Sequence, residues 1–145
     1  MATISKSISI KAPVDRVFAY LIHPEHLPEI WPSLVEVTHV KTKPDGAHSY
    51  DWLYKMAGIK FRGHAETVQV EHDKLVVVKN ETGIPSTFRW TYGAKDGATE
   101  LNLEVDYTVP IPILGKLAAP IVGKLNEHEM VTLLENLKTR MEATA

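Results

Sequence analysis

The C-terminal part of the chain, residues 115–141, holds a long amphipathic segment that constrains the fold more than any other stretch. Its apolar face repeats at spacings of three and four residues, which is the periodicity of an α-helix. The members of this face are Ala119, Val122, Asn126, Met130, Leu133, Leu137 and Met141. At a rise of about 1.5 Å per residue the helix is about 40 Å long, enough to cross a small domain. We therefore expect the rest of the chain to supply a long apolar surface that covers this face.

The N-terminal part of the chain predicts one strand followed by two short helices. In residues 4–10 isoleucines alternate with serines, which is typical of a half-buried strand. Pro13 suits the first turn of a helix, and residues 14–22 carry an amphipathic pattern. A second short helix is expected over residues 25–30. Each helix ends where a proline follows, because the residue before proline avoids helical angles.

From Pro32 to Pro110 the period of the apolar residues changes to two, and turn sequences divide this stretch into six strands. The clearest turns are residues 43–46 and 95–97, which combine glycine with aspartate or proline. Consecutive strands joined by tight turns must be antiparallel. With the first strand, this predicts an α+β fold in which a seven-stranded antiparallel sheet is covered by the C-terminal helix.

The inward positions of this sheet are rich in aromatic residues. They are Tyr50, Trp52, Tyr54, Phe88, Trp90, Tyr92 and Tyr107. Two interpretations are open at this point. The rings either fill the core against the helix, since aromatic side chains are the largest apolar groups available, or they line a ligand cavity, since such cavities are mostly apolar and aromatic.

Two stretches resemble domains of the START-like (SRPBCC) superfamily, which includes polyketide cyclase/dehydrase and lipid-transport proteins. They are ISIKAPVDRVFAYLIHPEHLPEIWPSL, with its Ala-Pro, Val-Phe and Trp-Pro pairs, and VDYTVPIPILGKLAAPIVGKLNEHEMVTLLENLKTRME. The resemblance covers the whole chain and implies one domain over residues 1–145 with the helix-grip fold. In that fold the sheet wraps around the C-terminal helix and encloses a cavity, which favours the cavity interpretation. The resemblance implies no particular activity, because the superfamily includes carriers, sensors and enzymes.

The candidate ligand-binding residues lie on the aromatic strand faces, after the second short helix and on the long helix. They are Trp31, Tyr50, Trp52, Tyr54, Phe88, Trp90, Tyr107, Val122, Asn126 and Met130. Asn126 is the most specific of them, because a buried amide without a hydrogen bond costs about 1–3 kcal/mol. Its side chain is expected either to bind a carbonyl or hydroxyl of the ligand, or to bond a strand carbonyl or a buried water.

Residues 61–70 hold the candidates for acid–base chemistry, His64 and Glu66. Both share a parity with Val68 and Val70, so they face the cavity if the valines do. A polar pair at that place would supply an acid and a base within reach of a ligand. The opposite parity is small and apolar and makes an equally good inward face, and a β-bulge would switch the parity within the strand.

Composition excludes several classes of function. The chain has no cysteine, which removes disulfides and thiolate chemistry, and its formal net charge of −2 without basic runs argues against nucleic-acid binding. His23 and His26 have the spacing of two metal ligands, but Pro24 lies between them and no third ligand accompanies them, so we expect neither a metal nor a cofactor. No segment has transmembrane length or a signal-peptide pattern, so we expect a cytoplasmic protein without stable membrane insertion.

These observations predict a domain that binds a hydrophobic or amphipathic small molecule, such as a lipid, an isoprenoid or a polyketide-like compound, without converting it. The alternative is a polyketide cyclase or dehydratase that uses polar residues of the same cavity. A further alternative is a protein-interaction module without a ligand. Either a monomer or a homodimer is compatible with the sequence, since an exposed edge strand would allow two subunits to pair.

Overall fold

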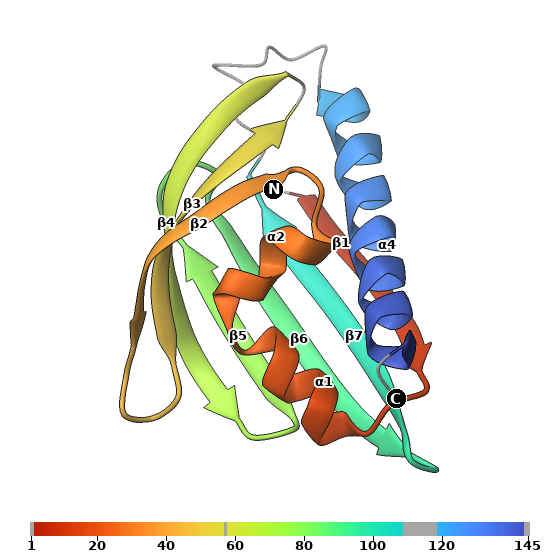
Figure 1. The fold of residues 1–145 in the computed structure, drawn as a ribbon. Coiled ribbons are helices and arrows are strands. Elements are labelled where there is room, and N and C mark those ends of the chain that lie inside the picture. Colours follow the sequence, from red (N-terminus) through yellow and green to blue (C-terminus); the bar gives the residue numbers. More distant parts are fainter. Residues whose placement is uncertain (1, 57, 109–118, 144–145) are drawn as a thin grey trace.

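The computed structural model describes residues 2–56, 58–108 and 119–143. Figure 1 shows a curved sheet, a long helix along one side of it and short helices in front. The elements in chain order are β1 (Ala2–Ile10), α1 (Val14–Leu21), the 3₁₀ turn η1 (Pro24–His26), α2 (Leu27–Ile30), β2 (Leu34–Thr42), β3 (His48–Met56), β4 (Ile59–Glu71), β5 (Leu75–Asn80), β6 (Ser86–Lys95), β7 (Ala98–Tyr107) and α4 (Ala119–Ala143). This is the predicted order of strands and helices.

The sheet has seven strands in the order β1-β7-β6-β5-β4-β3-β2, and every neighbouring pair is antiparallel. Each strand from β2 to β6 pairs with the next one along the chain, while β1 pairs with β7 at the other edge of the sheet. The long helix α4 packs against β1, and α2 packs between β2 and α4. The predicted α+β helix-grip fold is confirmed.

The inner face of the sheet is built by the alternation that the sequence predicts. In β7 the side chains of Leu101, Leu103, Val105 and Tyr107 are all buried. In β3 the aromatic residues and Met56 are buried in the same way, because successive side chains of a strand point to opposite faces. Leu53 is buried as well, although it lies on the other parity of β3.

The strand β4 changes its inward parity at a β-bulge. Before the bulge Ala65 and Thr67 are buried, and the register shifts between Thr67 and Gln69. The extra residue, Val68, is exposed, and beyond it Val70 pairs with Val76 of β5. The positions of Val68 and Val70 therefore do not predict which side chains face inward in the first half of β4. The bulge inserts one residue between the two halves and reverses the inward parity.

The helix α4 buries a continuous seam in its second half. Leu133 and Leu137 are completely buried, and Leu134 and Met141 nearly so. Residues 115–118 of the predicted helix, and the loop before it, lie outside the described residues. Pro120 falls in the first turn of the described helix, where a missing backbone N–H is tolerated.

Candidate functional site

A cavity lies between the inner face of the sheet, the short helices and α4. Its volume is about 100 Å³. All but one of the predicted ligand-binding residues line it, namely Trp31, Tyr50, Trp52, Tyr54, Phe88, Trp90, Tyr107, Asn126 and Met130. Val122 is buried on α4 but is not part of the lining. Because many rings face this space, the aromatic residues both pack the core and line a cavity.

One polar group of the wall joins the end of β3 to α4. The hydroxyl of Tyr54 donates to Oδ1 of Asn126 at 3.5 Å, a long and weak hydrogen bond. Burial raises the pKa of Tyr54, and the charge of Glu129 adds to that shift. The amide of Asn126 therefore faces the cavity and also bonds a tyrosine of the sheet, a partner that was not among those expected.

Trp31 sits beside this polar group and has an unsatisfied donor. Its ring lies 5.4 Å from the rings of both Tyr54 and Phe88. The indole approaches the Tyr54 hydroxyl closely enough to lower the pKa of that phenol somewhat, yet its Nε1 is buried without hydrogen-bond geometry to any of the described residues. A buried donor in this state favours any ligand atom that can accept from it.

A second polar group runs through the middle of the cavity wall. Nε1 of Trp52 donates to Oδ1 of Asn80 at 2.9 Å, and Nδ2 of Asn80 donates to the hydroxyl of Ser86 at 3.0 Å. These bonds satisfy the polar edge of the Trp52 ring, which lies over Gly63 of β4. Asn80 was not among the predicted site residues, although it shares the inward parity of Val76 and Val78.

A third polar group occupies the start of β3, where His48 and Tyr50 line the cavity. The backbone N–H of His48 donates to the hydroxyl of Thr67 at 3.2 Å, while Nδ1 of its ring is buried without a hydrogen bond to the part of the chain that the structure describes. Burial lowers the pKa of His48, and the neighbouring His23, whose ring lies 5.6 Å away, lowers it further. Burial raises the pKa of the Tyr50 phenol. Both side chains are therefore held in their neutral forms.

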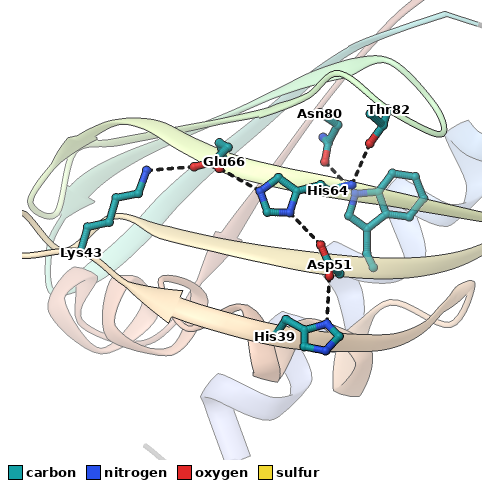
Figure 2. A network of polar contacts seen from close by, with 8 residues as sticks. His39, Lys43, Asp51, His64, Glu66, Asn80 and Thr82 are labelled. Carbon is teal, nitrogen blue, oxygen red and sulfur yellow. Dashed lines mark hydrogen bonds and ion pairs between the residues drawn. The ribbon is translucent and has the colours of Figure 1, made fainter.

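His64 and Glu66 do not belong to the cavity, so their predicted place in it is wrong. Both point to the outer face of β4, because the parity before the bulge turns Ala65 and Thr67 inward. Figure 2 shows them in a chain of polar contacts that also includes Lys43 and Asp51. The side chain of His64 is 44% exposed. This polar network lies on the surface and joins β3 and β4 to Lys43, which precedes β3.

The geometry of this network fixes the charge of His64. Nδ1 of its ring lies 2.7 Å from Oδ1 of Asp51, and Nε2 lies 2.8 Å from Oε1 of Glu66. Both nitrogens face carboxylates and must donate, so the ring is an imidazolium. The hydrogen bonds to Asp51 and Glu66 raise the pKa of His64. A protonated ring on the outer face cannot act as a base toward a molecule in the cavity.

Replacing His64 by glutamine is expected to destabilise the protein more at pH 6 than at pH 9. The pKa of His64 is raised above its usual 6.5 in the folded state, so its contribution is complete below that pH and is lost as the pH rises through the raised value. The lowered pKa values of Asp51 and Glu66 keep both carboxylates ionised at pH 6. The difference stays below about 1 kcal/mol, because exposed ion pairs contribute little.

Urea unfolding at the two pH values measures this difference, with His128→Gln as the control because His128 is an exposed histidine of α4. An equal loss of stability at both pH values would show that the charge of His64 makes no contribution.

The described residues contain no group of three or more histidine, aspartate or glutamate side chains placed to hold a metal ion. The rings of His23 and His26 lie edge to face, with centroids 5.7 Å apart, and Nδ1 of His26 is 2.7 Å from the carbonyl oxygen of Tyr20. In the part of the chain that the structure describes, no helix has the length and apolar character needed to cross a membrane.

Solved structures with the same fold extend over nearly the whole chain. A protein of Thermus thermophilus is 21% identical, with a TM-score of 0.86 and 99% of each chain covered. The Zhui aromatase/cyclase from Streptomyces sp. R1128 is 15% identical, with a TM-score of 0.82, covering 97% of this chain and 93% of that chain. A START superfamily protein from Mycobacterium smegmatis is 15% identical, with a TM-score of 0.78 and 99% of each chain covered.

At these identities the likeness establishes the helix-grip fold and nothing more specific. A search of curated proteins finds no match. The family model described as polyketide cyclase / dehydrase and lipid transport matches residues 1–142, which is nearly the full length of the chain. The chain therefore belongs to the polyketide cyclase / dehydrase and lipid transport family.

Proposed function

We propose that this protein binds a hydrophobic or amphipathic small molecule, such as a lipid, an isoprenoid or a polyketide-like compound, between the sheet and α4. The observation that carries this proposal is the cavity wall. It contains every tryptophan of the chain and every tyrosine except Tyr20, together with aliphatic residues such as Val76 and Val78. A wall of this kind, interrupted by a few polar groups, is typical of sites for small apolar ligands.

Binding at this site is driven by the burial of apolar surface. Each Å² of apolar area removed from water contributes about 25 cal/mol, and the cost of ordering the ligand and side chains is subtracted from that sum. Hydrogen bonds to the polar groups at Asn126 and at His48 would orient the ligand in the cavity. They lie at opposite ends of the cavity wall, since Tyr54, which bonds Asn126, is six residues from His48 along β3, a distance of about 20 Å.

A cyclase or dehydratase activity on a polyketide-like substrate is the second candidate, and His48 is the observation that favours it. A neutral imidazole inside an apolar cavity is able to accept a proton, and Tyr50 stands beside it on the same strand face. The two candidate functions are distinguished by what happens to the bound molecule. A binding protein returns its ligand unchanged, whereas an enzyme returns a product with a different mass. The existence of the cavity weighs against an interaction module without a ligand.

Native mass spectrometry of the protein purified from its own source tests the leading proposal, because a copurified ligand would appear as a mass shift. A thermal-shift screen with a panel of lipids and polyketide-like compounds complements it. A ligand at 100 times its dissociation constant should add about 2.7 kcal/mol to the free energy of unfolding. A spectrum of the bare chain, combined with no thermal shift across the panel, would overturn the proposal.

Substituting Asn126 by leucine is expected to leave the fold intact and to change which ligands bind. The change removes one amide from the wall and a hydrogen bond of 3.5 Å, so the free energy of unfolding should fall by no more than about 1 kcal/mol. Ligands that carry a carbonyl or hydroxyl should lose affinity relative to hydrocarbon analogues. Thermal unfolding and the ligand panel measure the two effects separately.

The matched control for this prediction is Asn136→Leu on the same helix. Nδ2 of Asn136 donates to the carbonyl oxygen of Ile30 at 3.0 Å, and the residue does not line the cavity. The control should lower stability without changing ligand preference. Unfolding of the Asn126→Leu variant at room temperature would show that Asn126 has a structural role instead.

A further inference from the structure

The cavity wall offers no partner for a charged group. None of the described residues that line it is an aspartate, glutamate, lysine or arginine. A charge carried into such a space loses its hydration and gains no counter-ion, which is strongly unfavourable. The buried part of any ligand is therefore uncharged, and a carboxylate or an ammonium group would have to remain outside.

Two hydrogen-bonding groups at the start of β3 are left without partners. His48 is 4% exposed. The backbone of Gly46 approaches its ring closely enough to raise its pKa somewhat, but Nδ1 has no hydrogen-bond geometry to any described residue. Tyr50 is 8% exposed, and burial alone raises the pKa of its phenol, with no hydrogen bond from a described residue contributing. These residues alternate along one strand, so their side chains are neighbours on the inner face of β3. Buried polar groups in folded proteins nearly always have partners. The unpartnered ring nitrogen of His48, next to the Tyr50 hydroxyl on the same cavity wall, therefore points to a place for a polar group of a ligand.

Most other polar groups of the wall have partners, and the exception among the described residues is Nε1 of Trp31. The indole of Trp52 is bonded to Asn80, and the hydroxyl of Tyr54 is bonded to Asn126. The backbone N–H of His48 already has its partner in Thr67, so only the ring nitrogen remains. Among the described residues, two polar side chains with unsatisfied capacity are thus adjacent at the start of β3, whereas Nε1 of Trp31 lies apart from them, beside Tyr54.

We propose that His48 and Tyr50 together bind a hydroxyl or carbonyl group of an uncharged, largely aromatic or aliphatic ligand, so that phenols, alcohols and ketones are the class selected. This inference rests on the proposed function. A ligand hydroxyl can accept from the Tyr50 phenol and exchange a second hydrogen bond with the imidazole, whose free nitrogen donates or accepts according to its tautomer. The lowered pKa of His48 and the raised pKa of Tyr50 agree with this, because neither supplies a charge near neutral pH.

Three probes with the same two-ring body test the proposal: naphthalene, 2-naphthol and 2-naphthoate. Dissociation constants are measured by ligand-observed NMR titration of the full chain at pH 7.5, where the naphthoate is ionised. We expect 2-naphthol to bind about tenfold more tightly than naphthalene, the gain of about one additional buried hydrogen bond. We expect 2-naphthoate to bind more weakly than 2-naphthol, because its charge has no counter-ion in the wall.

The variant Tyr50→Phe tests the named residue, since it removes the hydroxyl and keeps the ring. It should bind naphthalene as the wild type does and should lose most of the tenfold preference for 2-naphthol. Tyr20→Phe is the matched control, because the hydroxyl of Tyr20 donates to Glu29 outside the cavity. That variant should keep the preference in full.

The outcomes separate the two proposals. Equal affinities of the wild type for naphthalene and 2-naphthol would overturn the inference, and so would tightest binding of 2-naphthoate. Retention of the preference by a folded Tyr50→Phe variant would overturn the role of Tyr50. The wild-type series alone decides the ligand class if that variant does not fold. Binding of none of the three probes, combined with the negative ligand screen described above, would instead overturn the proposed function.

Discussion

Substitution of Gly63 by alanine is expected to lower the free energy of unfolding by about 3 kcal/mol, a large effect for the addition of one methyl group. A Cβ atom at this position would lie 2.6 Å from Cε2 of Trp52 and 2.7 Å from the carbonyl oxygen of Thr82. The Trp52 ring would have to move, and its hydrogen bond to Asn80 would break. Overpacking and the loss of a buried hydrogen bond therefore add.

Chemical denaturation measures this loss, and Gly93→Ala is the matched control. Gly93 is also a strand glycine, but a Cβ atom there would lie 3.7 Å from the nearest atom, the carbonyl oxygen of Glu100. The control should change stability by no more than about 0.5 kcal/mol. The Gly63 variant should also bind the cavity ligand less well, because Trp52 lines the cavity. Wild-type stability in the Gly63→Ala variant would mean that the Trp52 ring can adopt another position without loss of stability.

The substitution Leu137→Ala is expected to cost about 3 kcal/mol of stability, because Leu137 lies in the packed seam of α4 and is completely buried. Removing its side chain leaves a void that rigid neighbours fill only in part. The matched comparison is Met130→Ala two turns earlier on the same helix. Met130 borders the existing cavity, so its side chain has fewer neighbours to lose and the expected cost is about 1–2 kcal/mol.

The two helix variants should also differ in their effect on binding. Met130→Ala enlarges the cavity and should admit bulkier ligands, whereas Leu137→Ala should leave ligand preference unchanged because Leu137 is not part of the lining. Urea unfolding and the ligand panel measure both quantities. A greater loss of stability for Met130→Ala than for Leu137→Ala would contradict the division of α4 into a cavity half and a packed half.

The fold could be predicted from the sequence because its signals are repeated along the chain. The alternation of apolar residues recurs in strand after strand, and the helical period of α4 persists over several turns, so single irregular positions such as Asn126 do not obscure it. The same alternation placed the aromatic side chains on the inner face. Whether these rings enclose a space depends on how well they fit together, and a pattern of residue types carries no information about that fit.

The orientation of His64 and Glu66 could not be predicted for a different physical reason. A strand has a side-chain period of two, so a single inserted residue reverses the inward face. In β4 the insertion is at Val68, a β-branched residue that is ordinary for a strand and gives no sign of a bulge. Val70, beyond the bulge, therefore faces inward, whereas His64, before it, faces outward, although the two residues are an even number of positions apart.

His48 and Asn80 were missed although a signal was present. His48 precedes Tyr50 by two residues, and Asn80 follows Val78 by two, so both have the inward parity of their strands. Both also lie at strand ends beside turn sequences, where polar residues are expected to be solvated. Their burial results from residues that are distant in sequence: the ring of His23 packs against His48, and the indole of Trp52 donates to Asn80.

The placement of Trp31, Trp52 and Trp90 in one cavity wall has an optical consequence. These are all the tryptophans of the chain, so its entire indole emission originates at the surface that a ligand would touch. The three indoles differ in environment, since Trp52 is hydrogen-bonded to Asn80 and Nε1 of Trp31 has no hydrogen bond within the described ranges. A molecule that enters the cavity displaces water from these rings or quenches them directly. The unlabelled protein thus contains its own fluorescent reporter of occupancy, which can follow binding on the timescale of rapid mixing.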